Sequence, residues 1–67
     1  MINIGKNIKS FRRRSSFTQA YLAERLGISA QAVSKWENGT SMPDIMLLPE
    51  IARVFGVSID ELFSDGE

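Results

Sequence analysis

Residues 18–39 decide the fold, and they read TQAYLAERLGISAQAVSKWENG. Thr18 and Ser29 are residue types that cap helix N-termini, and each precedes an apolar run with helical spacing. Gly27 stands where a helix commonly ends in a left-handed residue, and an Asn-Gly pair closes the second run. The stretch therefore predicts two short helices joined by a tight turn, a connection that makes the helices cross steeply.

A steep crossing of two helices makes demands that this stretch meets. Ala23 is small where the second helix crosses the first, and Gly27 can take a positive φ that a Cβ would disfavour. Ile28 is expected to fill the space beneath the turn with its apolar side chain. The shared core is expected to consist of Leu22, Leu26, Val33 and Trp36. An aromatic such as Trp36 could instead stack on a base or a ligand, but its place in the periodicity favours the core.

The remaining chain also shows helical spacing. Apolar residues recur at i, i+4 and i+7 from Ile4 and predict a first helix of about residues 4–14. A fourth helix is expected to begin near Met46, with Pro49 in its first turn, where proline is tolerated. It should contain Leu47, Leu48, Ile51, Ala52 and Phe55 and end at Gly56.

The end of the chain predicts one more short helix. Ser58 and Glu61 have the spacing of a capping box, and Leu62 and Phe63 follow as its apolar residues. Residues 40–44 are expected to form a polar loop, and Ser64–Glu67 is expected to fray. With no strand pattern in the sequence, we expect one all-α domain over residues 1–67, with five helices and a helix-turn-helix core at residues 18–38.

The composition excludes several classes of protein. The 67-residue chain has no cysteine and no histidine, which removes disulfides, thiolate metal sites and the commonest acid–base residue. No apolar run approaches the ~20 residues of a membrane span, and the N-terminus lacks the layout of a signal peptide. The late acidic residues Asp60, Glu61, Asp65 and Glu67 are interpreted as capping and solvation. We expect a cytoplasmic protein that is not an enzyme, with no catalytic residue, metal, cofactor or small-molecule ligand.

The net charge of zero conceals two opposite halves. Residues 1–42 carry seven basic and two acidic side chains, a net charge of +5, whereas residues 43–67 carry one basic and six acidic side chains, a net charge of −5. A phosphate backbone would lie against the basic half. The alternative is a chance segregation of solvated charges.

The stretch at residues 18–39 resembles the Cro/phage-repressor (XRE) family of helix-turn-helix proteins. The similarity continues through Pro43 and Asp44 and through residues 47–62, which look like that family's fourth and fifth helices, so it covers about residues 4–63. The resemblance implies a five-helix, phage-repressor-like domain that binds DNA, usually as a dimer on a pseudo-palindromic operator. The segment Ser29–Glu37 would then enter the major groove.

The resemblance also implies which residues meet the bases. Gln31 matches a position that reads base edges, and a glutamine can bond adenine N6 and N7 bidentately; the alternative is a solvated helix residue. Lys35, one turn further on the same face, would reach either a guanine or a phosphate. Ala30 would offer its methyl group to a thymine methyl, and Ser34 would bond either a base or a phosphate.

Other positions are implied to contact the DNA backbone. Gln19 lies at the N-terminus of the second helix, where its side chain and free N–H groups can hold a phosphate. Tyr21 departs from the family, in which a glutamate is common and would complete a capping box with Thr18. We expect this exposed tyrosine to touch the sugar–phosphate backbone. The expected phosphate contacts are Thr18, Gln19, Tyr21, Asn38, Thr40 and Ser41.

Arg12 and Glu37 match a pair that forms a partly buried salt bridge in the family, between the first helix and the end of the third. We expect this ion pair to be structural, because removing one partner would leave a charge unpaired.

Two functions fit these features. The first is sequence-specific binding of double-stranded DNA by a transcriptional regulator, expected to be a repressor. The second is a protein-interaction module, such as the antitoxin of a toxin–antitoxin pair, which can also regulate its own operon. It is motivated by apolar residues in the acidic half and beside it, namely Met42, Ile45, Met46, Leu62 and Phe63. A homodimer is expected because one module covers one half-site, with the fifth helix and the loop before the fourth as its surface.

Overall fold

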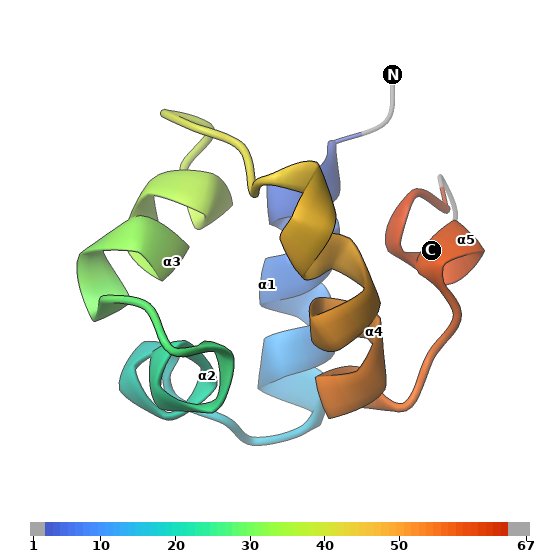
Figure 1. The fold of residues 1–67 in the computed structure, drawn as a ribbon, viewed down its shortest axis with the longest axis horizontal. Coiled ribbons are helices and arrows are strands. Elements are labelled where there is room, and N and C mark those ends of the chain that lie inside the picture. The colour runs from blue at the N-terminus through green and yellow to red at the C-terminus, as the bar shows by residue number, and fades with distance from the viewer. Residues whose placement is uncertain (1–2, 65–67) are drawn as a thin grey trace.

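The computed structural model describes residues 3–64 and contains five α-helices. They are α1 (Ile4–Arg14), α2 (Gln19–Leu26), α3 (Ala30–Glu37), α4 (Leu48–Phe55) and α5 (Ile59–Leu62), with a short 3-10 helix η1 (Ile45–Leu47) before α4. In Figure 1, α1 lies between the α2–α3 pair and the α4–α5 side of the molecule. No strand occurs between residues 3 and 64, so the all-α, five-helix prediction is confirmed.

Polar side chains set the beginnings of the helices. Asn3, Thr18 and Ser29 each accept a hydrogen bond from the backbone N–H three residues further on, at 3.0, 2.9 and 3.1 Å. Ser58 and Glu61 form the predicted capping box, with both of its reciprocal hydrogen bonds. These caps satisfy N–H groups that have no partner within the helix. The helix boundaries therefore follow largely from local chemistry.

The start of α4 differs from the prediction of a helix from Met46. Asp44 instead caps a single 3-10 turn, its carboxylate accepting the N–H of Met46 at 2.8 Å, and the α-helix begins at Leu48. Pro49 occupies the first turn of α4, as expected. A proline ring clashes with the carbonyl four residues earlier in a regular α-helix, which here is that of Ile45. The chain therefore forms a 3-10 turn before Pro49, which avoids this clash.

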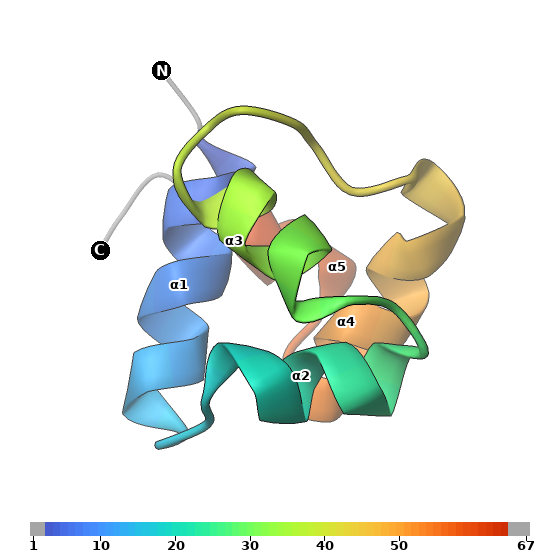
Figure 2. The ribbon, with the colours of Figure 1, turned by 90° about the vertical axis from the view of Figure 1, so that its left-hand side faces the viewer.

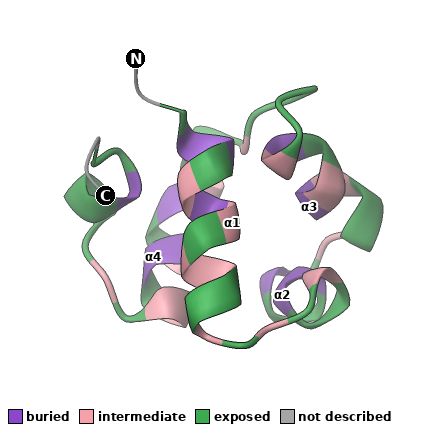
Figure 3. Cartoon of the chain, turned by 180° about the vertical axis from the view of Figure 1, so that it is seen from behind, coloured by how far each residue is buried: buried purple, intermediate pink, exposed green. Residues whose placement is uncertain are grey.

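The hydrophobic core lies where all five helices meet (Figure 3). Its buried members are Ile4, Ile8, Leu22, Ala23, Leu26, Val33, Trp36, Leu48, Ile51, Ala52 and Leu62. Trp36 is only 5% exposed, which confirms its assignment to the core. Phe11, Leu47 and Phe55 pack at the edge of this core, while Phe63 follows α5 as its C-cap and is 36% exposed.

An aromatic cluster closes the end of the core near the α1–α2 loop. The ring of Phe55 lies 5.7 Å from that of Phe11 and 6.3 Å from that of Phe17, and Phe17 lies 4.6 Å from Tyr21. Phe17 falls in the loop between two periodic runs, so no periodicity in the sequence predicts its place in this cluster. Its ring nevertheless joins α4 to the start of α2.

The two ends of the described chain are held together by Asn7. Its Nδ2 donates to the carbonyl oxygens of Leu62 and Ser64, both at 2.8 Å. Of the segment Ser64–Glu67 that we expect to fray, Ser64 is therefore tied to α1, and residues 65–67 lie outside the described residues. No helix within residues 3–64 has the length and apolar character needed to cross a bilayer.

Candidate nucleic-acid interface

The helix-turn-helix unit places α3 across α2 on one face of the molecule, toward the viewer in Figure 2. Gly27 ends α2 with φ at 73°, in the left-handed region that glycine adopts at little cost. Ala23 is buried beneath the crossing, and Ile28 packs against the core from the turn. The structure therefore has the small residue at the crossing, the left-handed glycine and the apolar turn residue that a steep crossing requires.

The outward face of α3 carries the four residues expected to meet bases. Ala30, Gln31 and Lys35 are exposed, and Ser34 is half-buried. On the opposite face, Val33 is fully buried and Trp36 nearly so, and they hold the helix against the core. The helix thus presents a small, mostly polar surface on a fixed support.

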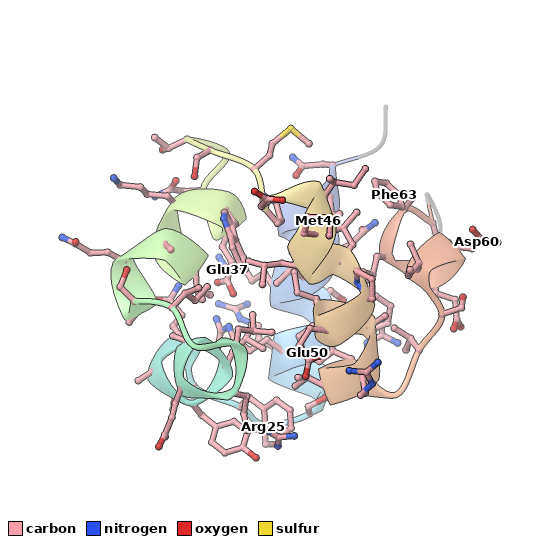
Figure 4. All side chains as sticks on the ribbon, in the orientation of Figure 1. Arg25, Glu37, Met46, Glu50, Asp60 and Phe63 are labelled. Carbon is pink, nitrogen blue, oxygen red and sulfur yellow. The ribbon has the colours of Figure 1, made fainter. Side chains whose placement is uncertain are left out.

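A second anchor of α3 is the ion pair between Arg12 and Glu37. Arg12 donates from Nε to Glu37 Oε2 at 2.6 Å and from Nη2 to Glu37 Oε1 at 3.0 Å. Its Nη1 also donates to the carbonyl of Phe17 at 2.7 Å. The side chains are only 13% and 3% exposed, and Figure 4 shows Glu37 pointing into the space between α3 and α1. One guanidinium therefore ties α1, the start of α2 and the end of α3 together.

Gln19 joins this network, which the sequence did not indicate. Its Nε2 donates to Glu37 Oε1 at 3.0 Å, and the side chain is half-buried. The amide nitrogen expected to meet a phosphate is thus already bonded to the carboxylate at the end of α3. Backbone N–H groups in the first turn of α2 still lack intrahelical partners, so the expected phosphate contact at Gln19 rests more on its backbone than on its side chain.

The network also sets the protonation of its carboxylate. Burial by itself would raise the pKa of Glu37, but hydrogen bonds from Arg12 and Gln19, with the attraction of Arg12 and Lys9, hold that pKa below its ordinary value. The hydrogen bond to Glu37 in turn raises the pKa of Arg12, against the opposing effect of burial. Both groups therefore stay charged at neutral pH.

The other expected phosphate contacts lie on the surface, mostly with local partners. The Thr18 hydroxyl caps α2, and the Tyr21 hydroxyl accepts a hydrogen bond from Arg25 at 2.9 Å. Asn38 Oδ1 accepts from the backbone and hydroxyl of Thr40, at 3.3 and 2.7 Å, which shapes the chain after α3. Ser41 is exposed in the following loop. Their contacts with phosphate stay predictions.

One residue that positions α3 was missed by the sequence reasoning. Gly5 is buried in α1, and a Cβ added there would overlap the carbonyl oxygen of Trp36 and lie 2.8 Å from its carbonyl carbon. The backbones of α1 and α3 therefore approach each other as closely as a glycine permits. A glycine in the first turn of a helix is an available signal, but its partner 31 positions away is not visible in the sequence.

These features define a helix-turn-helix domain, and comparison with known proteins agrees. The family model described as "Helix-turn-helix" matches residues 8–62. The chain belongs to this family, in its Cro/phage-repressor type, as the resemblance implied. The family is one of DNA-binding transcriptional regulators.

Two curated relatives show how this domain is used in longer proteins. The HTH-type transcriptional activator BcrR of Enterococcus faecalis is 38% identical over 66 residues, covering 98% of this chain and 32% of BcrR. The antitoxin PezA of Streptococcus pneumoniae is 40% identical over 62 residues, covering 92% of this chain and 39% of PezA. The chain spans less than half the length of these relatives.

Two solved structures share the fold closely. The P22 c2 repressor, in complex with a synthetic operator, has a TM-score of 0.87 and 26% identity, with 98% of this chain and 100% of that chain covered. The hydroxypropylphosphonic acid epoxidase from S. wedmorenis has a TM-score of 0.84 and 30% identity, but the match covers only 35% of that chain. This second likeness concerns one domain of that enzyme and assigns no enzyme activity to the present chain.

Proposed function

We propose that the chain binds double-stranded DNA sequence-specifically and regulates transcription, with α3 as the helix that enters the major groove. The observation that carries the proposal is the outward face of α3, whose Ala30, Gln31 and Lys35 are exposed while Val33 and Trp36 fix the helix from behind. Major-groove readout requires a helix that is both accessible and rigidly held. The likeness to a repressor bound to its operator supports the same docking mode.

The proposed base contacts follow from side-chain chemistry. Gln31 can donate to adenine N7 and accept from adenine N6 at the same time, a pairing worth about 1–3 kcal/mol of discrimination. Lys35 lies one turn along the same face and reaches a guanine or a neighbouring phosphate. Ala30 packs against a thymine methyl, and Ser34 bonds a base or a phosphate.

The backbone contacts are proposed at the start of α2 and just after α3. Free N–H groups at Gln19 face one phosphate, because a helix N-terminus attracts anions. Asn38 already orients Thr40 through two hydrogen bonds, so the chain there is ordered for a second phosphate, with Ser41 beyond it. Such contacts set register and affinity without reading sequence.

We propose that the chain acts as a homodimer in the cytoplasm. We further propose that it represses transcription by occupying an operator, because blocking a site on DNA requires no contacts other than those with the DNA. The alternative is activation of transcription, since BcrR is named an activator. Expression of a reporter gene from the bound promoter distinguishes repression from activation. The dimer surface is proposed around η1 and α5. Met42, Ile45 and Met46 are 72%, 74% and 81% exposed there, and Met46 and Phe63 lie toward the same edge in Figure 4.

A second candidate function is that of an antitoxin, favoured by the likeness to PezA and by the same exposed apolar residues. An antitoxin would use those residues to cover a toxin and would use α3 to regulate its own operon. Co-expression with the product of the neighbouring gene distinguishes the two readings. A stable complex that forms while the chain has no affinity for DNA would favour the antitoxin alone.

Selection of duplexes from a random pool tests the proposed function. We expect enrichment of a pseudo-palindrome whose half-sites lie about one helical turn apart. Gln31→Ala should relax the preference at one position per half-site, whereas Arg53→Ala, an exposed change on α4 away from α3, should leave the preference intact. No enrichment, or an unchanged preference in Gln31→Ala, would reject the proposal.

A further inference from the structure

A basic groove runs along α1 beside the end of α3, and none of the contacts proposed above explains it. Its volume is about 580 Å³. Four basic side chains of α1 line it, namely Lys6, Lys9, Arg13 and Arg14, and Asn38 and Gly39 line it from the end of α3. The groove is therefore continuous with the segment proposed to hold a phosphate.

Among the described residues, the basic side chains of this groove outnumber its acidic ones by four to one. Glu37 is its one acidic lining residue, and that carboxylate is already bonded by Arg12 and Gln19. Within residues 3–64, no ion pair or hydrogen bond engages the ammonium group of Lys6 or the guanidinium group of Arg13. These cations are therefore available to an anionic partner.

The spacing of the cations suits a row of charges better than a single anion. Lys6, Lys9 and Arg13 lie at i, i+3 and i+7, so they share one face of α1. Seven residues of α-helix span about 10 Å. One strand of duplex DNA carries a phosphate about every 3.4 Å of helix axis. Because neighbouring phosphates of a strand lie at least this far apart, the row is long enough to face more than one of them, whereas a free phosphate would need cations that converge on one point.

We propose that this groove binds the phosphate backbone of duplex DNA outside the base pairs that α3 reads. The inference rests on the proposed function, because the strand that passes Asn38 at the end of α3 is the one that continues into the groove. Lys6, Lys9 and Arg13 add affinity and salt dependence there without adding sequence preference.

The test measures the affinity of the chain for its selected duplex, extended by flanking sequence at both ends, over a series of salt concentrations. Lys6→Gln and Arg13→Gln should each reduce the slope of log K against log salt by about 0.9, and the double variant by about twice that. The affinity ratio between selected and shuffled duplexes should not change. Arg53→Gln on α4 is the charge-matched control and should keep the original slope. Circular dichroism verifies that all variants are folded.

The possible outcomes separate this inference from the proposed function. A double variant that keeps the parental slope overturns the groove while leaving DNA binding by α3 in place. A parent chain without salt-dependent binding overturns the proposed function itself. With a duplex trimmed to the selected base pairs, the double variant and the parent should show the same slope. If the double variant still loses as much slope on the trimmed duplex, its cations contact phosphates within the selected base pairs, which refutes the proposed placement of the groove contacts. Inorganic phosphate that binds at the groove as strongly as the extended duplex would show a free-anion site instead.

Discussion

Gly5→Ala is expected to destabilise the chain, although helix propensity favours the opposite result. Alanine is more favourable than glycine in a helix by up to about 1 kcal/mol. The new Cβ, however, would overlap the Trp36 carbonyl oxygen and lie 2.8 Å from its carbonyl carbon. Carbon atoms in contact lie about 3.5–4.0 Å apart, so α1 and α3 must separate by at least about 0.7 Å. Both contacting groups are backbone and cannot rotate away.

Overpacking of this kind costs about 1–3 kcal/mol. Because both clashing groups are backbone, we expect a cost of about 2–3 kcal/mol here, which exceeds the gain in propensity by about 1–2 kcal/mol. For a domain of this size, a net loss of 1–2 kcal/mol lowers Tm by about 4–16 °C. Urea and thermal unfolding, followed by circular dichroism and by the fluorescence of Trp36, measure the change. Ser10→Ala, at an exposed position of the same helix, is the control and should be nearly neutral. A Gly5→Ala chain as stable as its parent, or more so, would refute the proposed limit on the α1–α3 approach.

Three further predictions concern single side chains. Arg12→Ala should cost about 3–5 kcal/mol, because it leaves the buried Glu37 carboxylate without its cation; a loss below about 1 kcal/mol in urea unfolding would instead indicate an exposed-type pair. Because the pKa of Glu37 is lowered in the folded state, its ionised form stabilises the chain above the ordinary value of 4.5, and this contribution is lost as the pH falls through the folded pKa. The stability difference between parent and Glu37→Gln should therefore shrink between pH 6 and pH 3, and a constant difference would contradict the assignment. Ser58→Ala should cost about 1 kcal/mol by removing the cap of α5, and an unchanged urea midpoint would show that α5 is held by packing alone.

Most of the fold could be predicted because its signals are local. Gly27 and Gly56 end helices in the left-handed region, and Ser58 with Glu61 forms its capping box within four residues. The apolar spacing identified the core, including Trp36. The α-helix begins at Leu48, two residues after the expected start near Met46, because the chain approaches Pro49 through a 3-10 turn.

The contacts that could not be predicted join residues far apart in the chain. The hydrogen bond from Gln19 to Glu37 and those from Asn7 to the carbonyls of Leu62 and Ser64 depend on how the helices are assembled. No periodicity encodes such pairs, since a polar residue at the edge of a helix face has several possible partners. The Arg12–Glu37 pair was expected only because the family resemblance implied it.

If the outward face of α3 reads DNA bases, the chain must distinguish the selected duplex from a shuffled duplex of equal length, and the ratio of the two affinities measures this. At fixed physiological salt, specific binding should exceed non-specific binding by about 10³-fold or more. Gln31→Ala should reduce that ratio by about 5–150-fold per adenine contact while leaving the affinity for the shuffled duplex unchanged. Equal affinities of the parent chain for the two duplexes would show that α3 does not read bases.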